Sequence, residues 1–191
     1  MSAGRVLETD GVRWLFDAGA DSLDFTSGSA EEVAGWLVDR FERLPAASLG
    51  ERELVDALAL RAAITRLAAC AADRTEPDPD DVDILNLFAA TPDIPPVLDG
   101  GRRQAGAVSI RPGQVLSTLA RDAVALLAET ATARSTVATP TDGAGRIRRC
   151  SADGCGMVFH DESRTGTRRW CSMARCGNRA KVRAFRERAA S

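Results

Sequence analysis

Two pairs of cysteines, in Cys150-Ser-Ala-Asp-Gly-Cys155 and Cys171-Ser-Met-Ala-Arg-Cys176, decide the fold of the C-terminal part of this 191-residue chain. Tetrahedral zinc is held by four soft ligands that arrive as two local pairs on two turns. The segment around the cysteines has few large apolar side chains, too few to offset chain entropy without a metal staple. The spacing therefore predicts one structural Zn²⁺ bound by all four thiolates.

The same four cysteines leave two alternatives, a disulfide or unpaired reduced thiols. The chain shows no signal peptide and no apolar run long enough to span a bilayer, so we expect a cytoplasmic protein whose thiols stay reduced. A reducing compartment argues against the disulfide. Four thiolates also leave no coordination position for a catalytic water, which argues against metal-assisted hydrolysis.

The remaining candidates for chemistry receive structural interpretations. His160 is the only histidine and an alternative zinc ligand, but with four cysteines present we interpret it as a strand residue near the surface. Cys70 falls in an expected helix beside Leu67 and Ala71, where a small core residue is the simplest interpretation. The body has no Gly-rich phosphate loop and no nucleophile elbow. We therefore expect no enzyme.

The zinc segment should fold as a β-hairpin followed by a helix. Residues 157–160 are typical of a strand and residues 168–171 of the returning strand. Residues 178–188 form helices readily, and Val182 and Phe185 are expected to face the metal core.

Charge is divided sharply along the chain. Residues 1–145 carry a net charge of −10 and residues 146–191 a net charge of +8. Arginine suits phosphate because its planar fork donates two hydrogen bonds at once. The basic segment predicts nucleic-acid contacts by Arg148, Arg149, Arg164, Arg168, Arg169, Asn178, Arg179, Lys181, Arg183 and Arg186. The alternatives are a solvated basic face, or attraction between the two halves of the chain.

Three residues of the basic segment have two readings each. Trp170 is able to stack on a base, but packing beside the zinc site is the interpretation we favour. Asn178 is either a plain cap for the last helix or part of the contact surface. In the second reading Arg179 points toward a phosphate held at the helix N-terminus.

The rest of the chain reads as a mostly helical domain with a small β-hairpin, an α+β fold. Capping boxes at Ser29–Glu32 and Ser48–Glu51 predict two helix starts. Helices are expected from residue 33 to Pro45, from 51 through 71 with Leu58 on its apolar face, from 82 to 88, and onward from Pro112. A β-hairpin or two short strands are expected over 93–111. A stretch poor in apolar residues predicts a linker, so the expected domains are 1–130, linker 131–145, and finger 146–191.

The segment Cys171-Ser-Met-Ala-Arg-Cys-Gly-Asn-Arg-Ala-Lys181 resembles the CGNR zinc-finger family, whose naming motif stands here at residues 176–179. Such fingers follow an ABATE domain, and Leu23-Asp-Phe25, Ala34-Gly-Trp-Leu37 and the helix from Leu54 resemble that domain. The resemblance implies a bacterial, stress-induced transcription regulator whose finger binds DNA and whose body senses a signal. The linker is longer than is typical of the family, which argues against rigid coupling between the two parts.

The leading hypothesis is therefore a DNA-binding transcription regulator, cytoplasmic and associated with the nucleoid. The alternatives are an RNA-binding protein and a protein-interaction adaptor that uses the same finger. A homodimer is expected because one finger makes few base contacts. The signal, a small molecule or a protein, is not identified by any residue pattern.

Overall fold

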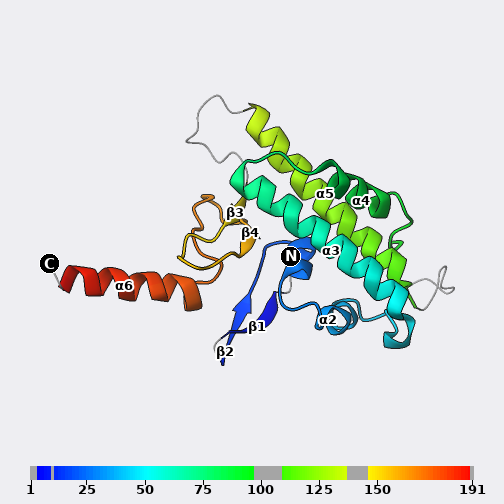
Figure 1. Cartoon of the computed structure of the whole chain (residues 1–191), viewed down its shortest axis with the longest axis horizontal. Coiled ribbons are helices and arrows are strands. Elements are labelled where there is room, and N and C mark those ends of the chain that lie inside the picture. Colours follow the sequence, from blue (N-terminus) through cyan, green and yellow to red (C-terminus); the bar gives the residue numbers. More distant parts are fainter. Residues whose placement is uncertain (1–3, 10, 97–108, 137–145, 190–191) are drawn as a thin grey trace.

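The computed structural model describes residues 4–9, 11–96, 109–136 and 146–189 (Figure 1). The elements in chain order are β1 (Arg5–Thr9), β2 (Val12–Phe16), α1 (Asp21–Thr26), α2 (Val33–Arg40), η1 (Ala46–Ser48), α3 (Glu51–Asp73), α4 (Pro79–Ala89), α5 (Pro112–Thr136), β3 (Ile147–Arg149), β4 (Val158–His160), η2 (Met173–Gly177) and α6 (Asn178–Ala189). In the described residues β1 pairs with β2 and β3 with β4, each pair antiparallel. The expected α+β class is confirmed.

Helices α3, α4 and α5 each pack against the other two, and the buried core that they share extends to β2, α1, α2 and the C-terminal segment. Leu60, Ile64 and Leu67 of α3 are buried, and their spacing of three and four residues places them on one helix face. The predicted long helix is confirmed, but its expected apolar face is slightly wrong. Leu58 is 37% exposed, while Ala57 is fully buried.

The start of α3 differs from the expected capping box. The Glu53 carboxylate accepts a hydrogen bond from the Gly50 N–H at 3.1 Å, so Gly50 is the cap. Ser48 instead belongs to η1 and donates its hydroxyl to the Pro45 carbonyl at 2.6 Å. The capping box therefore lies two residues later than predicted, because Ser48 is part of the short 3-10 turn.

Helix α2 begins as predicted and ends early. The Glu32 carboxylate accepts the Ser29 N–H at 2.8 Å, and the helix starts at the next residue. It ends at Arg40 rather than at Pro45, since Phe41 already has the non-helical angles φ −119° and ψ 81°. The chain leaves the helix there to bring Leu44 into the core.

The β-hairpin of the body lies at the N-terminus, where no sequence pattern predicted one. Val6 pairs with Leu15 across β1 and β2, and the turn contains Gly11 at φ +73°. The hairpin expected over 93–111 falls mostly on residues 97–108, outside the described residues, and the flanking described residues form no strand. Both faces of β1 and β2 carry apolar residues, so the polar–apolar alternation that marks a half-buried hairpin is weak here.

Helix α5 runs through the first part of the expected linker. It continues to Thr136, and the buried Thr130 hydroxyl donates to the Leu126 carbonyl at 3.0 Å. That bond satisfies the hydroxyl within the helix, so threonine does not end α5. Within the part of the chain that the structure describes, no helix has the length and apolarity needed to cross a membrane.

The C-terminal segment packs against the helical body through β3 and β4. The His160 N–H donates to the Ala18 carbonyl at 2.7 Å, and β3 lies against α3. A Cβ on Gly19 would lie 2.5 Å from the His160 carbonyl oxygen, so only glycine permits this approach. Arg149 pairs with Asp73 at the end of α3, with Nε 2.9 Å from Oδ1. The expected loose coupling is therefore wrong: these contacts join the two parts.

Candidate metal centre and nucleic-acid interface

The four predicted cysteine ligands converge on one point. Their Sγ atoms all lie within 4.8 Å of one another, with 3.7 Å between Cys155 and Cys171 and 3.5 Å between Cys171 and Cys176. Zinc–sulfur bonds of about 2.3 Å in a tetrahedron place the sulfurs roughly 3.8 Å apart. The cluster contains no histidine or carboxylate. The donor set fits one structural Zn²⁺, as the cysteine spacing predicted.

The first pair of ligands is positioned by the β3–β4 hairpin. Cys150 follows β3 directly, and its N–H donates to the Met157 carbonyl at 2.9 Å. Gly154, at φ +69°, turns the chain so that Cys155 comes back toward Cys150.

The second pair is positioned by the π-helical turn η2. The Cys171 N–H points at the Cys150 sulfur, 3.4 Å away, which links the two pairs. Cys176 is fully buried inside η2. Gly177 follows it, where a Cβ would lie 2.7 Å from the sulfur of Met173, an exposed and flexible side chain that would have to shift.

Electrostatics within the cluster call for a cation. Burial, the Cys176 sulfur and the negative charge of nearby thiolates raise the pKa of Cys171 far above its usual range. Burial opposes ionisation of Cys150 too, but N–H groups of Cys171 and Ala152 outweigh it and lower the pKa of Cys150. Four thiolates this close repel one another strongly without a dication between them. When bound, zinc ionises all four and acts as the structural centre of the finger.

Asp161 is a buried polar centre to which the sequence pattern assigned no role. Its carboxylate is fully buried and accepts hydrogen bonds from the Ser163 N–H at 3.0 Å and the Arg168 N–H at 2.8 Å. The Ser163 hydroxyl donates to it as well, at 2.5 Å. Burial raises the pKa of Asp161, but these bonds outweigh burial and lower it overall. The Asp-x-Ser spacing was the available signal, because it is typical of a side chain capping a turn.

Three of the arginines predicted to contact nucleic acid have partners within the protein. Arg148 forms an ion pair with Asp161, at 3.6 Å. Arg149 is turned toward the end of α3, as described above. Arg168 donates to the Asp17 carbonyl at 2.8 Å and lies 4.2 Å from the centre of the Phe159 ring. These three guanidinium groups hold the finger together or hold it to the body.

Three other predicted arginines meet in a depression beside the metal site. Arg169, Arg179 and Arg183 line this cavity of about 250 Å³ together with Trp170. Arg169 lies 4.9 Å from the centre of the Trp170 ring, and Arg183 pairs with Asp153. Trp170 is half-buried and packs against the core beside the cysteines, which agrees with the packing interpretation. We call this depression the basic pocket.

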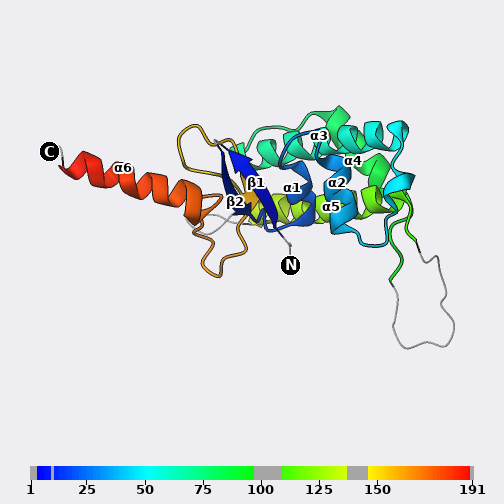
Figure 2. The ribbon, with the colours of Figure 1, turned by 90° about the horizontal axis from the view of Figure 1, so that it is seen from below.

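Helix α6 carries the remaining basic residues away from the body, as both views show (Figure 2). Lys181 and Arg186 are exposed on it, and Arg164 is exposed on the loop after β4. Val182 and Phe185 do not face the metal core as expected, since they are 49% and 67% exposed. They lie too far along a helix that projects beyond the compact part of the finger.

Asn178 does not cap α6. It has helical angles itself and donates its side-chain amide to the Ala174 carbonyl at 3.2 Å, because η2 runs directly into α6. No free helix N-terminus therefore faces a phosphate at this point. Arg179 instead lies 3.4 Å from the Cys176 sulfur, and this contact raises the pKa of Arg179.

The fold and the site define a helical domain that carries a C-terminal zinc finger of the four-cysteine type. A family model described as "CGNR zinc finger" matches residues 146–189. A second, the ABATE family described as "Putative stress-induced transcription regulator", matches residues 12–130, more than half of the chain. The chain belongs to the ABATE family and carries a CGNR zinc finger. No curated protein matches it.

Proposed function

We propose that this chain is a DNA-binding transcription regulator in which the finger contacts DNA and the helical body receives a signal. The basic pocket carries the proposal. Arg169, Arg179 and Arg183 line it next to the metal site, and Arg169 lies over the Trp170 ring. That combination suits a phosphate with its sugar or base attached. A cytoplasmic, nucleoid-associated location is part of the same proposal.

Helix α6 supports the proposal with a second run of positive charge. Lys181, Arg186 and Arg188 are exposed, and α6 has no buried residue to tie it to the body. An exposed basic helix of this kind lies readily against the phosphates of a duplex groove. The basic pocket and α6 adjoin, since Arg179 and Arg183 belong to both.

We propose binding rather than catalysis. The four thiolates take all four tetrahedral positions of a zinc ion, so the metal centre offers no place for a reacting water.

A homodimer is the form that we propose for binding to DNA, because one finger covers few base pairs. Val6 and Leu15 lie opposite each other across β1 and β2 and are 52% and 61% exposed. Paired apolar side chains on an open two-stranded sheet favour association with a second copy. Sedimentation equilibrium distinguishes dimer from monomer, and a monomer at all concentrations would contradict this part.

The test is a titration of the zinc-loaded protein with duplex DNA at several salt concentrations. We expect affinity to fall steeply with salt, because arginines displace counterions from the phosphates. Arg169→Ala should weaken binding by roughly tenfold, about 1.4 kcal/mol. Arg52→Ala is the matched control: it removes an equal charge from an exposed site at the start of α3 and should leave affinity unchanged.

The same titration separates the alternatives. Single- and double-stranded RNA of the same sequence compete in a second series. Preference for RNA would replace the proposal with an RNA-binding function. Weak binding without salt dependence, equal in both variants, would leave only a protein partner for the finger.

A further inference from the structure

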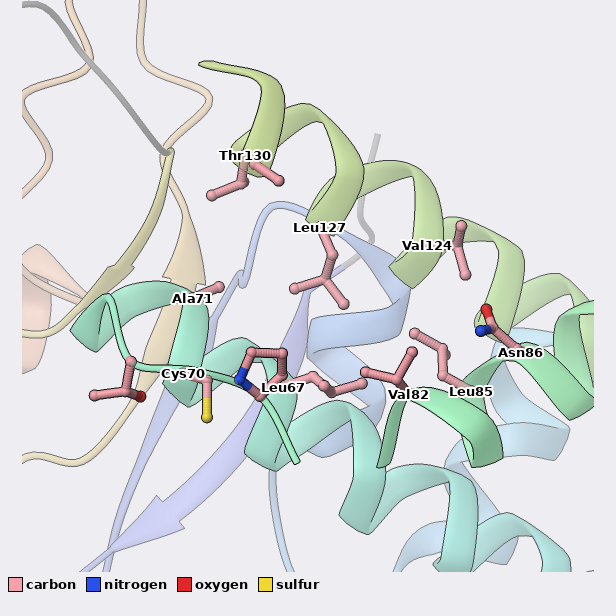
Figure 3. A pocket seen from close by; sticks show the side chains of 12 residues that line it. Leu67, Cys70, Ala71, Val82, Leu85, Asn86, Val124, Leu127 and Thr130 are labelled. Carbon is pink, nitrogen blue, oxygen red and sulfur yellow. The ribbon is translucent and has the colours of Figure 1, made fainter. Parts of the chain in front are cut away.

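A cavity of about 280 Å³ lies between α3, α4 and α5, away from the metal site (Figure 3). Leu67, Val82, Val124 and Leu127 contribute hydrocarbon to its walls, and the Asn86 amide lies at one end. This volume is near the lower end of small-molecule sites, on the order of 300 Å³.

The walls decide which chemistry the cavity accepts. None of its lining residues carries a charge at neutral pH, and the Thr130 hydroxyl is already bonded to the Leu126 carbonyl. Water molecules in the cavity would find few hydrogen-bond partners, because each ordered water needs two to four hydrogen bonds. An ion would lose its hydration without a counter-charge. An uncharged apolar molecule with one or two hydrogen-bonding groups, able to reach Asn86 or Thr75, matches the walls.

The cavity shares a wall with the docking site of the finger. Leu67, Cys70 and Ala71 line the cavity, and Asp73, on the next turn of α3, pairs with Arg149 of the finger. The chain then reverses at Arg74, whose φ is +59°, and the Thr75 N–H donates to the Cys70 carbonyl at 3.0 Å. Thr75 lines the cavity too. A molecule in the cavity therefore contacts both the last turns of α3 and the segment that ends them.

We infer that the cavity between α3, α4 and α5 binds a small, uncharged, apolar molecule, and that its occupancy stabilises the end of α3 on which the finger docks. The proposed binding site depends only on the cavity and its walls. Its use as a signal rests on the regulatory function proposed above.

The binding experiment uses the zinc-loaded full chain and the neutral dye N-phenyl-1-naphthylamine, which brightens in apolar surroundings. We expect a saturable rise in fluorescence at one dye per chain. Val124→Phe fills the cavity and should weaken dye binding at least tenfold. Val55→Phe is the matched control, because it adds the same ring to an exposed site on α3. Equal binding by all three proteins would overturn the site.

Cys70 provides a second measurement that needs no substitution in the core. It is the only cysteine outside the zinc ligand set, so alkylation by N-ethylmaleimide reports on the cavity wall. Bound dye should slow Cys70 alkylation at least threefold, and an unchanged rate would contradict the inference even if Val124→Phe fails to fold.

Hydrogen exchange tests the link to the finger. Saturating dye should slow exchange of the β3 and β4 amides at least twofold, and Arg149→Ala should reduce this effect. If exchange of these amides stays unchanged with the dye bound, the proposed link between the cavity and the finger is wrong, and the proposed binding site still holds. No step uses nucleic acid, so failure here is distinct from failure of the DNA titration.

Discussion

The helical body and the zinc finger are stabilised by different forces. The body buries large apolar side chains completely, among them Phe16, Phe25 and Leu60. In the described part of the finger, the buried apolar residues besides cysteines are Ile147 and Phe159. Burial of hydrocarbon is sufficient for the body, whereas the finger depends on a metal ion and on Asp161. We therefore expect that a substitution that destabilises one part leaves the other part folded.

The largest expected effect is loss of the metal. Cys171→Ala should lower bound zinc from one ion per chain to none and unfold residues 146–189, because structural zinc contributes about 10–16 kcal/mol to small fingers. The body should keep its helical circular dichroism. Metal analysis and hydrogen exchange measure the two results, with Cys70→Ala as the control that keeps zinc. Full zinc retention by Cys171→Ala would refute the ligand assignment.

A substitution that creates a cavity in the core of the body should destabilise the body and leave the zinc site intact. Leu60→Ala removes a fully buried side chain from α3 and should cost about 2–5 kcal/mol of the body's unfolding free energy. Zinc should remain at one ion per chain. Denaturant unfolding measures the loss, and Leu87→Ala, at a site 67% exposed on α4, should change stability by less than about 0.5 kcal/mol. Zinc loss in Leu60→Ala would show that the two parts do not differ as described.

Asp161→Ala should weaken the finger alone. It leaves the partly buried N–H groups of Ser163 and Arg168 without an acceptor, a cost of about 3 kcal/mol in total. Zinc should transfer to a chelator faster than from the wild type. Glu162→Ala, on the exposed neighbour, controls for the loss of one negative charge. Equal rates of zinc transfer from both variants would show that Asp161 does not stabilise the finger.

The smallest effect is expected where the two parts meet. Arg149 and Asp73 are 38% and 43% exposed, so their ion pair should contribute about 0.5–1 kcal/mol. A double-mutant cycle with Arg149→Ala and Asp73→Ala measures it. Additive effects of the two substitutions would show that this pair does not hold the finger to the body.

Local patterns in the sequence predicted the features that depend on few neighbours. The start of α2 needed only Ser29 and Glu32, and the long helix α3 needed only its apolar period. The N-terminal hairpin escaped prediction because its exposed face carries Val6 and Leu15, which hide the alternation. The end of α5 was misplaced because Thr130 satisfies its own hydroxyl inside the helix.

The sequence by itself determined the metal centre, since two short turns bring each pair of cysteines together whatever the rest of the chain does. Only the tertiary structure divided the arginines by role. Arg149 meets Asp73, which lies 76 residues earlier, and Arg168 meets the Asp17 carbonyl, which lies 151 residues earlier. Spacing along the chain carries no information on such contacts. They form because β3 and β4 pack against α3 and the Ala18–Gly19 loop, which leaves Arg169, Arg179 and Arg183 around the basic pocket.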